Sequence, residues 1–139
     1  MPIPIILVVE DSCIEQFAVE QLLKRFDYGV QIASSGEDAL IAVALKSYAA
    51  ILMDCQLPGM SGLDCTKLIR IMEIGSGRRT PVIAVTAREE ATFRSECLAA
   101  GMDDFLSKIY NPEQLRRVLL RHVYDPLEPN LKTLRPLLP

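Results

Sequence analysis

The chain has 139 residues and a formal net charge of −3; half of its residues are apolar and 24% are charged, which is typical of one domain with one hydrophobic core. Its scattered basic residues exclude the electrostatic pattern of a nucleic-acid-binding protein, so no nucleic-acid partner is expected. No apolar run approaches the roughly 18 residues of a membrane span and no signal peptide opens the sequence, so we expect a cytoplasmic chain without a membrane partner.

A continuous apolar run at 3–9 predicts a first strand that is buried on both faces. Directly after it, Ser12 and Glu15 have the spacing of a capping box, which predicts the start of a helix. The apolar stripe of this helix is predicted from its i, i+4 spacing and consists of Ile14, Ala18, Leu22 and Phe26.

The same two patterns alternate along the rest of the chain. Ser35, Ser61 and Asn111 stand where helix N-caps are expected, and Gly101 stands where a helix is expected to end. Further strands are predicted at 30–33, 50–53, 81–85 and 105–107, and further helices at 35–46, 61–74, 89–100 and 111–122. Alternating strands and helices predict an α/β fold with a parallel sheet covered on both faces.

The four cysteines lack the paired spacing of a metal site, and the chain has a single histidine. We interpret the cysteines as reduced and buried; they are Cys13, Cys55, Cys65 and Cys97. The histidine, His122, lies on the apolar stripe of the last predicted helix near its C-terminus, so we assign it a packing or capping role rather than that of a phosphohistidine.

Five polar residues stand at or just past the ends of four predicted strands: Glu10, Asp11, Asp54, Thr86 and Lys108. Right-handed crossovers place the carboxyl ends of all the parallel strands at one edge of the sheet, so these residues are expected to meet there. Turn chemistry could explain each one alone, because Asp often opens a turn. The shared location instead indicates a functional site.

The chemistry of this set suits phosphoryl transfer. Three carboxylates repel one another unless a cation neutralises them, and Mg²⁺ prefers oxygen ligands such as Asp11 and Asp54, with Glu10 behind them. A carboxylate can itself be the nucleophile and form an aspartyl phosphate. The ammonium of Lys108 and the hydroxyl of Thr86 are the donors that phosphoryl oxygens on Asp54 would need.

The chain resembles the receiver domains of two-component response regulators from about residue 3 to residue 123. The motifs that carry the resemblance are Glu10-Asp11, the run MDCQLPGMSG at 53–62, Val85-Thr86-Ala87, and the run GMDDFLSK at 101–108. The amino-acid sequences of the 53–62 and 97–108 segments are similar to those of receivers attached to hybrid sensor kinases. The resemblance implies a flavodoxin-like three-layer sandwich with a five-stranded parallel sheet of order 2-1-3-4-5.

The resemblance also implies a function. Asp54 would accept a phosphoryl group from a histidine on a kinase or phosphotransfer protein. Mg²⁺ would be held by Asp11, Asp54 and the backbone carbonyl of Gln56, with Glu10 assisting through water. The chain would be a phosphoacceptor switch with self-catalysed phosphorylation and dephosphorylation rather than an enzyme that acts on a separate substrate.

Further roles follow from the same resemblance. Thr86 and Lys108 would bind the phosphoryl oxygens, and Thr86 and Phe105 would be the switch residues. Gln56 and Arg88 occupy positions that tune dephosphorylation, and we hypothesise that Arg88 lies over the phosphoryl group and slows the approach of water. The output face would consist of the fourth helix, the fifth strand and the fifth helix, which a downstream partner or a second copy of the chain could bind.

The sequence departs from the family at Ile109, where a proline usually follows the lysine. A cis bond to a non-proline residue costs about 2.5–4 kcal/mol, so the Lys108-Ile109 bond could be trans or could keep the cis form as stored strain. A degenerate receiver that binds partners without being phosphorylated is therefore one alternative. The other is a haloacid-dehalogenase-type phosphatase, in which Asp103-Asp104 would be the late acidic pair; that family needs an acid two residues after the nucleophile, and here Gln56 stands there.

The domain boundary is placed at residue 123. The remaining segment, 124–139, is rich in proline and leucine and is interpreted as a tail or linker, because its prolines forbid a long regular helix. Residues 1–123 would then be the receiver domain.

Overall fold

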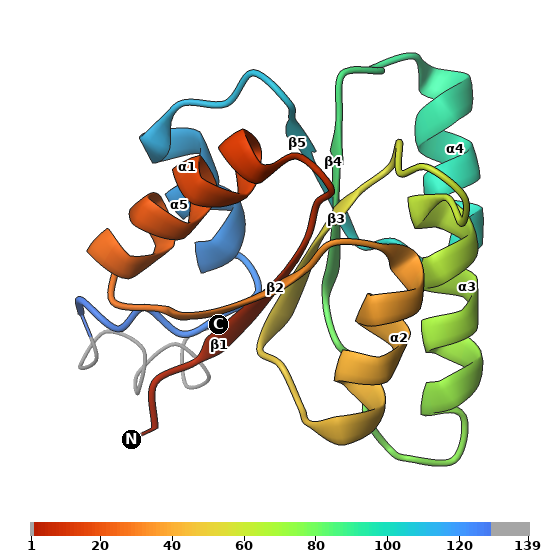
Figure 1. The fold of residues 1–139 in the computed structure, drawn as a ribbon, viewed down its shortest axis with the longest axis horizontal. Coiled ribbons are helices and arrows are strands. Elements are labelled where there is room, and N and C mark those ends of the chain that lie inside the picture. Colours follow the sequence, from red (N-terminus) through yellow and green to blue (C-terminus); the bar gives the residue numbers. More distant parts are fainter. Residues whose placement is uncertain (1, 129–139) are drawn as a thin grey trace, which may run out of the picture.

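Five parallel strands form one sheet in the order β2-β1-β3-β4-β5 in the computed structural model, which describes residues 2–128. The strands are β1 (Ile5–Val9), β2 (Gly29–Ala33), β3 (Ala50–Asp54), β4 (Val82–Thr86) and β5 (Asp104–Ser107). The helices are α1 (Cys13–Arg25), α2 (Gly36–Leu45), α3 (Gly62–Glu73), α4 (Ala91–Ala100) and α5 (Pro112–Leu120). Figure 1 shows α1 and α5 on one face of the sheet and α2, α3 and α4 on the other. The predicted three-layer α/β fold and its strand order are confirmed.

The side chains of β1 alternate between two hydrophobic cores. Leu7 and Val9 pack on the side of α2, α3 and α4, whereas Ile6 and Val8 pack on the side of α1 and α5. All five residues of β3, the central strand, are buried. Because successive side chains of a strand point to opposite faces, a strand covered on both faces must be apolar up to the edge of the sheet, where Asp54 ends β3. The uninterrupted apolar runs predicted this.

The predicted helix caps are present. The hydroxyls of Ser12, Ser35 and Ser61 each accept a hydrogen bond from the backbone N–H three residues later. Asn111 and Gln114 form a complete capping box at α5. Gly101 ends α4 with a φ of 109°, a left-handed conformation that glycine adopts without a steric penalty.

The apolar stripe predicted for α1 is wrong in its first half. Ile14 is 83% exposed and Ala18 is also exposed, whereas Val19, Leu23 and Phe26 are buried. The residues of α1 contain two stripes with helical spacing, and the pattern alone does not say which one faces the sheet. A related prediction also failed: Cys13, in the first turn, is exposed, while the other three cysteines are buried.

The capping box predicted for α1 is only half formed. Ser12 accepts a hydrogen bond from the Glu15 N–H at 3.4 Å, but its own N–H donates to the Glu10 carboxylate at 3.0 Å instead of to the Glu15 side chain. The Glu15 carboxylate is thus free to contact another part of the chain. Its partner, as shown below, is Lys108.

The ends of the chain differ in detail from the prediction. Helix α5 ends at Leu120, so His122 lies beyond the helix, where its Nε2 is 2.8 Å from the Asp104 carboxylate. Asp125, just past the predicted domain boundary, is buried and accepts a hydrogen bond from Arg116 at 2.8 Å. The rest of the proposed tail, 129–139, lies outside the described residues. Within 2–128, no helix is both long enough and apolar enough to cross a membrane.

Candidate functional site

Four of the predicted site residues meet at the carboxyl edge of the sheet. Asp54 is the last residue of β3 and Thr86 is the last residue of β4, while Glu10 directly follows β1 and Lys108 directly follows β5. Asp54, Thr86 and Glu10 are each at most 6% exposed. The arrangement follows from the parallel sheet, because every strand delivers its carboxyl end to this edge.

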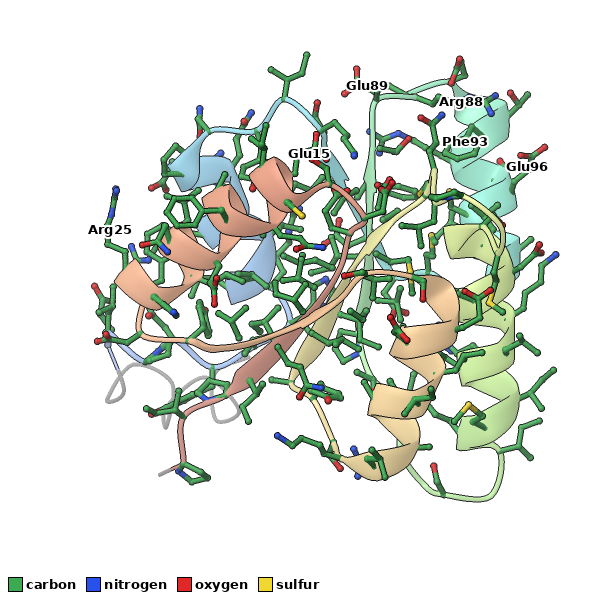
Figure 2. The ribbon with its side chains drawn as sticks, viewed as in Figure 1. Glu15, Arg25, Arg88, Glu89, Phe93 and Glu96 are labelled. Carbon is green, nitrogen blue, oxygen red and sulfur yellow. The ribbon has the colours of Figure 1, made fainter. Side chains whose placement is uncertain are left out.

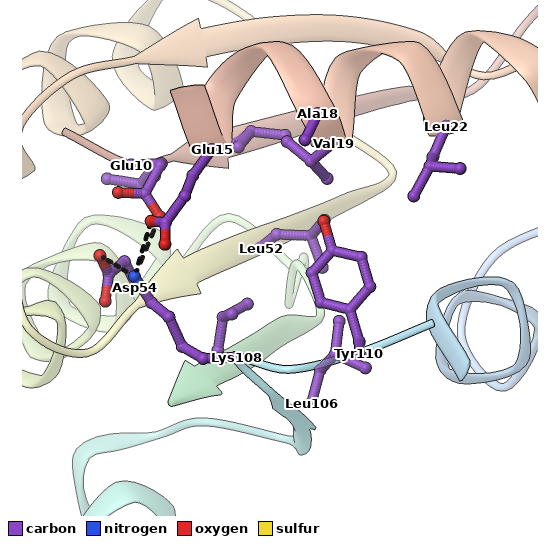
Figure 3. A pocket seen from close by; sticks show the side chains of 13 residues that line it. Glu10, Glu15, Ala18, Val19, Leu22, Leu52, Asp54, Leu106, Lys108 and Tyr110 are labelled. Atoms are coloured by element: carbon purple, nitrogen blue, oxygen red, sulfur yellow. Dashed lines mark hydrogen bonds and ion pairs between the residues drawn. The ribbon is translucent and has the colours of Figure 1, made fainter. Parts of the chain in front are cut away.

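Lys108 lies at the centre of the site and contacts three carboxylates (Figure 3). Its Nζ lies 3.0 Å from Asp54 Oδ2, 3.2 Å from Glu10 Oε1 and 2.9 Å from Glu15 Oε2. Burial disfavours the charged form of Lys108, but the hydrogen bonds to Glu15 and Asp54 outweigh that effect and raise its pKa. Lys108 is therefore a fixed positive charge beside the Asp54 carboxylate.

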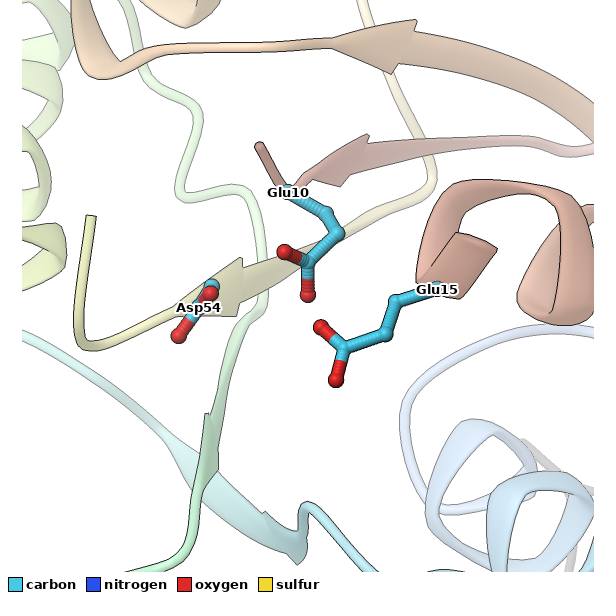
Figure 4. Close-up of side chains that lie close together, drawn as sticks. All are labelled: Glu10, Glu15 and Asp54. Carbon is cyan, nitrogen blue, oxygen red and sulfur yellow. The ribbon is translucent and has the colours of Figure 1, made fainter. Parts of the chain in front are cut away.

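Glu10, Glu15 and Asp54 bring their carboxylate oxygens within 4.8 Å of one another (Figure 4). Burial, together with a hydrogen bond to Glu15, raises the pKa of Glu10 to about 7. The hydrogen bond from Glu10 and the contact with Lys108 lower the pKa of Glu15. Three carboxylates around one ammonium leave an excess of negative charge, which is the environment that a hard divalent cation stabilises.

Glu15 is the residue of this site that sequence reasoning missed. Its spacing from Ser12 identified it as part of a capping box, which accounted for its charge locally. Glu15 lies five residues after Glu10, on the first turn of the helix that follows β1. A residue in this position is close to the carboxyl edge of the sheet, and this closeness was the signal in the sequence that could have identified it.

Asp11, predicted as a magnesium ligand, is not part of the carboxylate cluster. It is exposed, whereas the neighbouring Glu10 points into the site. Gln56 is exposed as well, and its N–H donates to Asp54 Oδ1 at 2.9 Å. That hydrogen bond fixes the orientation of the Asp54 carboxylate and leaves Oδ2 to Lys108.

The predicted switch residues, Thr86 and Phe105, and the predicted tuning residue Arg88 lie on the β4 and β5 side of the site. The buried Thr86 hydroxyl accepts a hydrogen bond from the Arg88 N–H at 2.9 Å. The Arg88 guanidinium packs over the ring of Phe93, 4.2 Å from its centroid (Figure 2). It also pairs with Glu90 at 3.5 Å. The half-buried Phe105 ring lies against the Arg94 guanidinium at 4.5 Å. The side chain of Arg88 is thus directed along α4, and no contact joins it to Asp54.

The peptide bond between Lys108 and Ile109 is trans. No cis peptide bond occurs in the part of the chain that the structure describes. Lys108 nevertheless contacts Asp54, and the Ile109 side chain is 90% exposed. The missing proline therefore does not prevent the lysine from reaching Asp54.

A cavity of about 280 Å³ adjoins the site between α1 and the loop after β5. Its mouth carries Glu10, Glu15, Asp54 and Lys108, and its wall is formed mainly by apolar side chains of α1 and the sheet (Figure 3). The carboxylates and Lys108 therefore border a space large enough for a small solute.

The late acidic pair of the phosphatase alternative, Asp103-Asp104, lies away from Asp54. Asp103 directly precedes β5, so it lies at the opposite end of the sheet from Asp54. There its carboxylate accepts a hydrogen bond from the N–H of Val82, the first residue of β4. Its carboxylate pairs with Arg70 and Arg79 at 2.8 Å each. Asp104, the first residue of β5, has His122 as its partner at 2.8 Å. Both residues of the pair thus have structural partners, and the phosphatase interpretation loses its support.

Comparison with known proteins agrees with this geometry. A family model described as the response regulator receiver domain matches residues 6–120. A probable histidine kinase 1 of Oryza sativa subsp. indica is 31% identical over 85% of the chain, and the sensor protein GacS of Pseudomonas syringae pv. syringae is 34% identical over 85%. The matched segments are 15% and 13% of the lengths of these relatives, so the chain corresponds to a small part of each.

A solved structure gives the same result for the fold. The receiver domain of the sensor histidine kinase PA1611 from Pseudomonas aeruginosa PAO1 is 38% identical, with a TM-score of 0.79 over 87% of this chain and 98% of that one. That structure holds a magnesium ion coordinated in its active site cleft.

Proposed function

The chain belongs to the response regulator receiver domain family, a family of phosphoacceptors in signal transduction, and on this premise we propose that Asp54 is its phosphoacceptor. The observation that carries the proposal is the contact of 3.0 Å between Asp54 Oδ2 and Lys108 Nζ, made by two residues 54 positions apart. A buried carboxylate at a strand end, paired with a fixed ammonium, is poised to receive a group that carries negative charge.

The chemistry is a displacement at phosphorus. One oxygen of Asp54 forms a bond to the phosphorus as the bond from phosphorus to the donor histidine nitrogen breaks, and that nitrogen keeps the electron pair. Lys108 and the Thr86 hydroxyl would stabilise the charge on the phosphoryl oxygens through charge-assisted hydrogen bonds. The chain itself supplies the accepting carboxylate, the ammonium and the hydroxyl, so we propose that phosphorylation and dephosphorylation are self-catalysed.

Mg²⁺ fits the donor set of the site. Asp11, Asp54 and the backbone carbonyl of Gln56 would hold the ion, and Glu10 would assist through a water molecule. When bound, Mg²⁺ would neutralise charge on the carboxylates and on the entering phosphoryl group. The side chain of Asp11 has to turn inward from its exposed position to take part.

Removal of magnesium is expected to stop phosphorylation. Without the ion, the three converging carboxylates repel an anionic donor, and Lys108 alone does not offset their charge. Intact mass after incubation with acetyl phosphate should therefore show at least a tenfold smaller phosphorylated fraction in excess EDTA than in Mg²⁺. EDTA saturated beforehand with Mg²⁺ is the control. Equal phosphorylation with and without free Mg²⁺ would contradict this metal dependence.

Thr86 and Phe105 are proposed to report the phosphorylated state. A phosphoryl group adds roughly −1.5 to −2 charge, which draws the Thr86 hydroxyl and Lys108 toward Asp54 and with them the ends of β4 and β5. Phe105 lies on β5 against Arg94 of α4, so its ring is placed to change position as these ends move. The face formed by α4, β5 and α5 is the proposed output surface for a downstream partner or a second copy of the chain.

Gln56 and Arg88 are proposed to set the lifetime of the phosphoryl group. For Arg88 this requires the guanidinium to leave Phe93 and Glu90 and to lie over the phosphoryl group, where it would exclude water. The phosphorylated Arg88→Ala variant is then expected to lose its phosphoryl group several-fold faster than the wild type, as followed by intact mass after removal of the donor. A decay rate equal to that of the wild type would remove Arg88 from this role.

The donor is proposed to be a phosphohistidine on a histidine kinase or phosphotransfer protein. The support is that the relatives which the chain matches are themselves described as histidine kinases or sensor proteins. The alternative of a receiver that binds partners without being phosphorylated is not favoured, because Lys108 reaches Asp54 despite Ile109.

A further inference from the structure

Glu15 makes the shortest of the three contacts to Lys108. Its Oε2 lies 2.9 Å from the ammonium nitrogen, compared with 3.0 Å for Asp54 and 3.2 Å for Glu10. The Glu15 side chain is 49% exposed and belongs to α1, whereas Lys108 follows β5 on the other side of the site. The pair therefore joins two residues that are 93 positions apart in the sequence.

An ammonium group has three N–H donors, and each donor of Lys108 faces a carboxylate in this structure. A phosphoryl oxygen on Asp54 can gain a hydrogen bond from Lys108 only when one of these contacts is given up. Phosphorylation converts the Asp54 carboxylate into an acyl phosphate, whose carboxyl oxygens no longer carry the negative charge, and this weakens that contact. Glu15 keeps its charge and still attracts Lys108 toward α1.

We propose that Glu15 is a positioning residue that holds Lys108 in the unphosphorylated site and slows its transfer to the phosphoryl group. The proposal rests on the proposed function of Asp54 and goes beyond it, because it adds a residue of α1 that competes for the lysine. Glu10 is buried and also contacts the backbone N–H of Ser12, so its orientation is fixed locally. The Glu15 side chain is half exposed and its carboxylate contacts Glu10 and Lys108, so its charge can be removed with little cost to the fold.

Glu15→Gln is expected to increase the initial rate of phosphorylation by acetyl phosphate at saturating Mg²⁺ about two- to fivefold, the range expected for a partly exposed ion pair. Glu20→Gln is the matched control. Glu20 lies on the same helix and pairs with Lys24 at 3.3 Å, so its substitution removes the same charge without touching Lys108. The rate for the control should equal that of the wild type. An unchanged or lower rate in Glu15→Gln would overturn the proposal.

A second substitution separates action through Lys108 from direct repulsion of the phosphoryl group. In a Lys108→Met background, followed over longer incubations, Glu15→Gln is expected to change the rate less than 1.5-fold, because no ammonium remains to be held. If the full two- to fivefold increase persists in that background, Glu15 acts directly on the entering group and the positioning role is wrong.

The pairing itself can be measured without phosphorylation. The side-chain ¹⁵Nζ signal of Lys108 in nuclear magnetic resonance spectra is expected to shift in Glu15→Gln and to stay unchanged in Glu20→Gln. A signal that does not respond to Glu15→Gln would overturn the proposal even if Asp54 is phosphorylated normally. Conversely, the Lys108 signal could shift in Glu15→Gln while the wild type takes up no phosphoryl group. That result would contradict the proposed function and not the ion pair.

Discussion

Lys108→Ala is expected to slow phosphorylation by acetyl phosphate about 10²- to 10³-fold, the loss typical when one preorganised donor to a developing charge is removed. Lys108 is the single ammonium whose Nζ contacts Asp54 in the described chain, and its pKa is raised, so it carries its charge at neutral pH. The substitution leaves Glu10, Glu15 and Asp54 facing one another without a side-chain cation. The initial rate, measured by intact mass at saturating Mg²⁺, checks this expectation.

Lys67→Ala is the control for that experiment. Lys67 is an exposed lysine on α3, so its substitution changes the net charge equally and leaves the site untouched. We expect the control to be phosphorylated at the wild-type rate. A Lys108→Ala protein that is phosphorylated within twofold of the wild type would contradict the role of the lysine in binding the phosphoryl group.

Gly62→Ala is expected to damage the site through the backbone. A Cβ at position 62 would lie 2.3 Å from the carbonyl oxygen of Asp54 and 2.9 Å from the Cα of Cys55. Real Cβ atoms do not approach backbone atoms so closely, so either the amino-terminal end of α3 or the chain that carries Asp54 must move. Overpacking of this kind costs roughly 1–3 kcal/mol. The free energy of unfolding in urea and the rate of phosphorylation should both decrease.

Gly75→Ala separates this steric effect from the ordinary cost of replacing glycine. Gly75 has a φ of +81° and nothing within 4 Å of an added Cβ, so the variant should lose about 1–2 kcal/mol through backbone strain alone. Its rate of phosphorylation should stay at the wild-type value. A Gly62→Ala protein with wild-type stability and a wild-type rate would show that the Asp54 backbone and α3 are not in the close contact described.

The strand-end residues could be predicted from the sequence because each depends on a local signal. An apolar run that stops at a polar residue marks a strand end, and parallel connectivity brings such ends together without any knowledge of side-chain orientation. Asp54, Thr86 and Lys108 were found in this way. The strand order depended on the resemblance to a family, since alternation of strands and helices leaves several orders open.

The features that the sequence did not reveal depend on contacts between distant residues or on rotamers. The partner of Glu15 is 93 residues away, and the nearby Ser12 offered a simpler local explanation of its charge. The two possible stripes of α1 differ only in which one meets the sheet. Asp11 and Glu10 are adjacent and chemically alike, so the sequence did not distinguish the inward carboxylate from the exposed one.

The central claim is that Asp54 is the phosphoacceptor, and intact mass tests it most directly. The wild type and Asp54→Ala are incubated side by side with acetyl phosphate and Mg²⁺. We expect one added phosphoryl group on the wild type and none on the variant. Equal phosphorylation of the two proteins, or no addition to a wild type that demonstrably binds Mg²⁺, would contradict the claim.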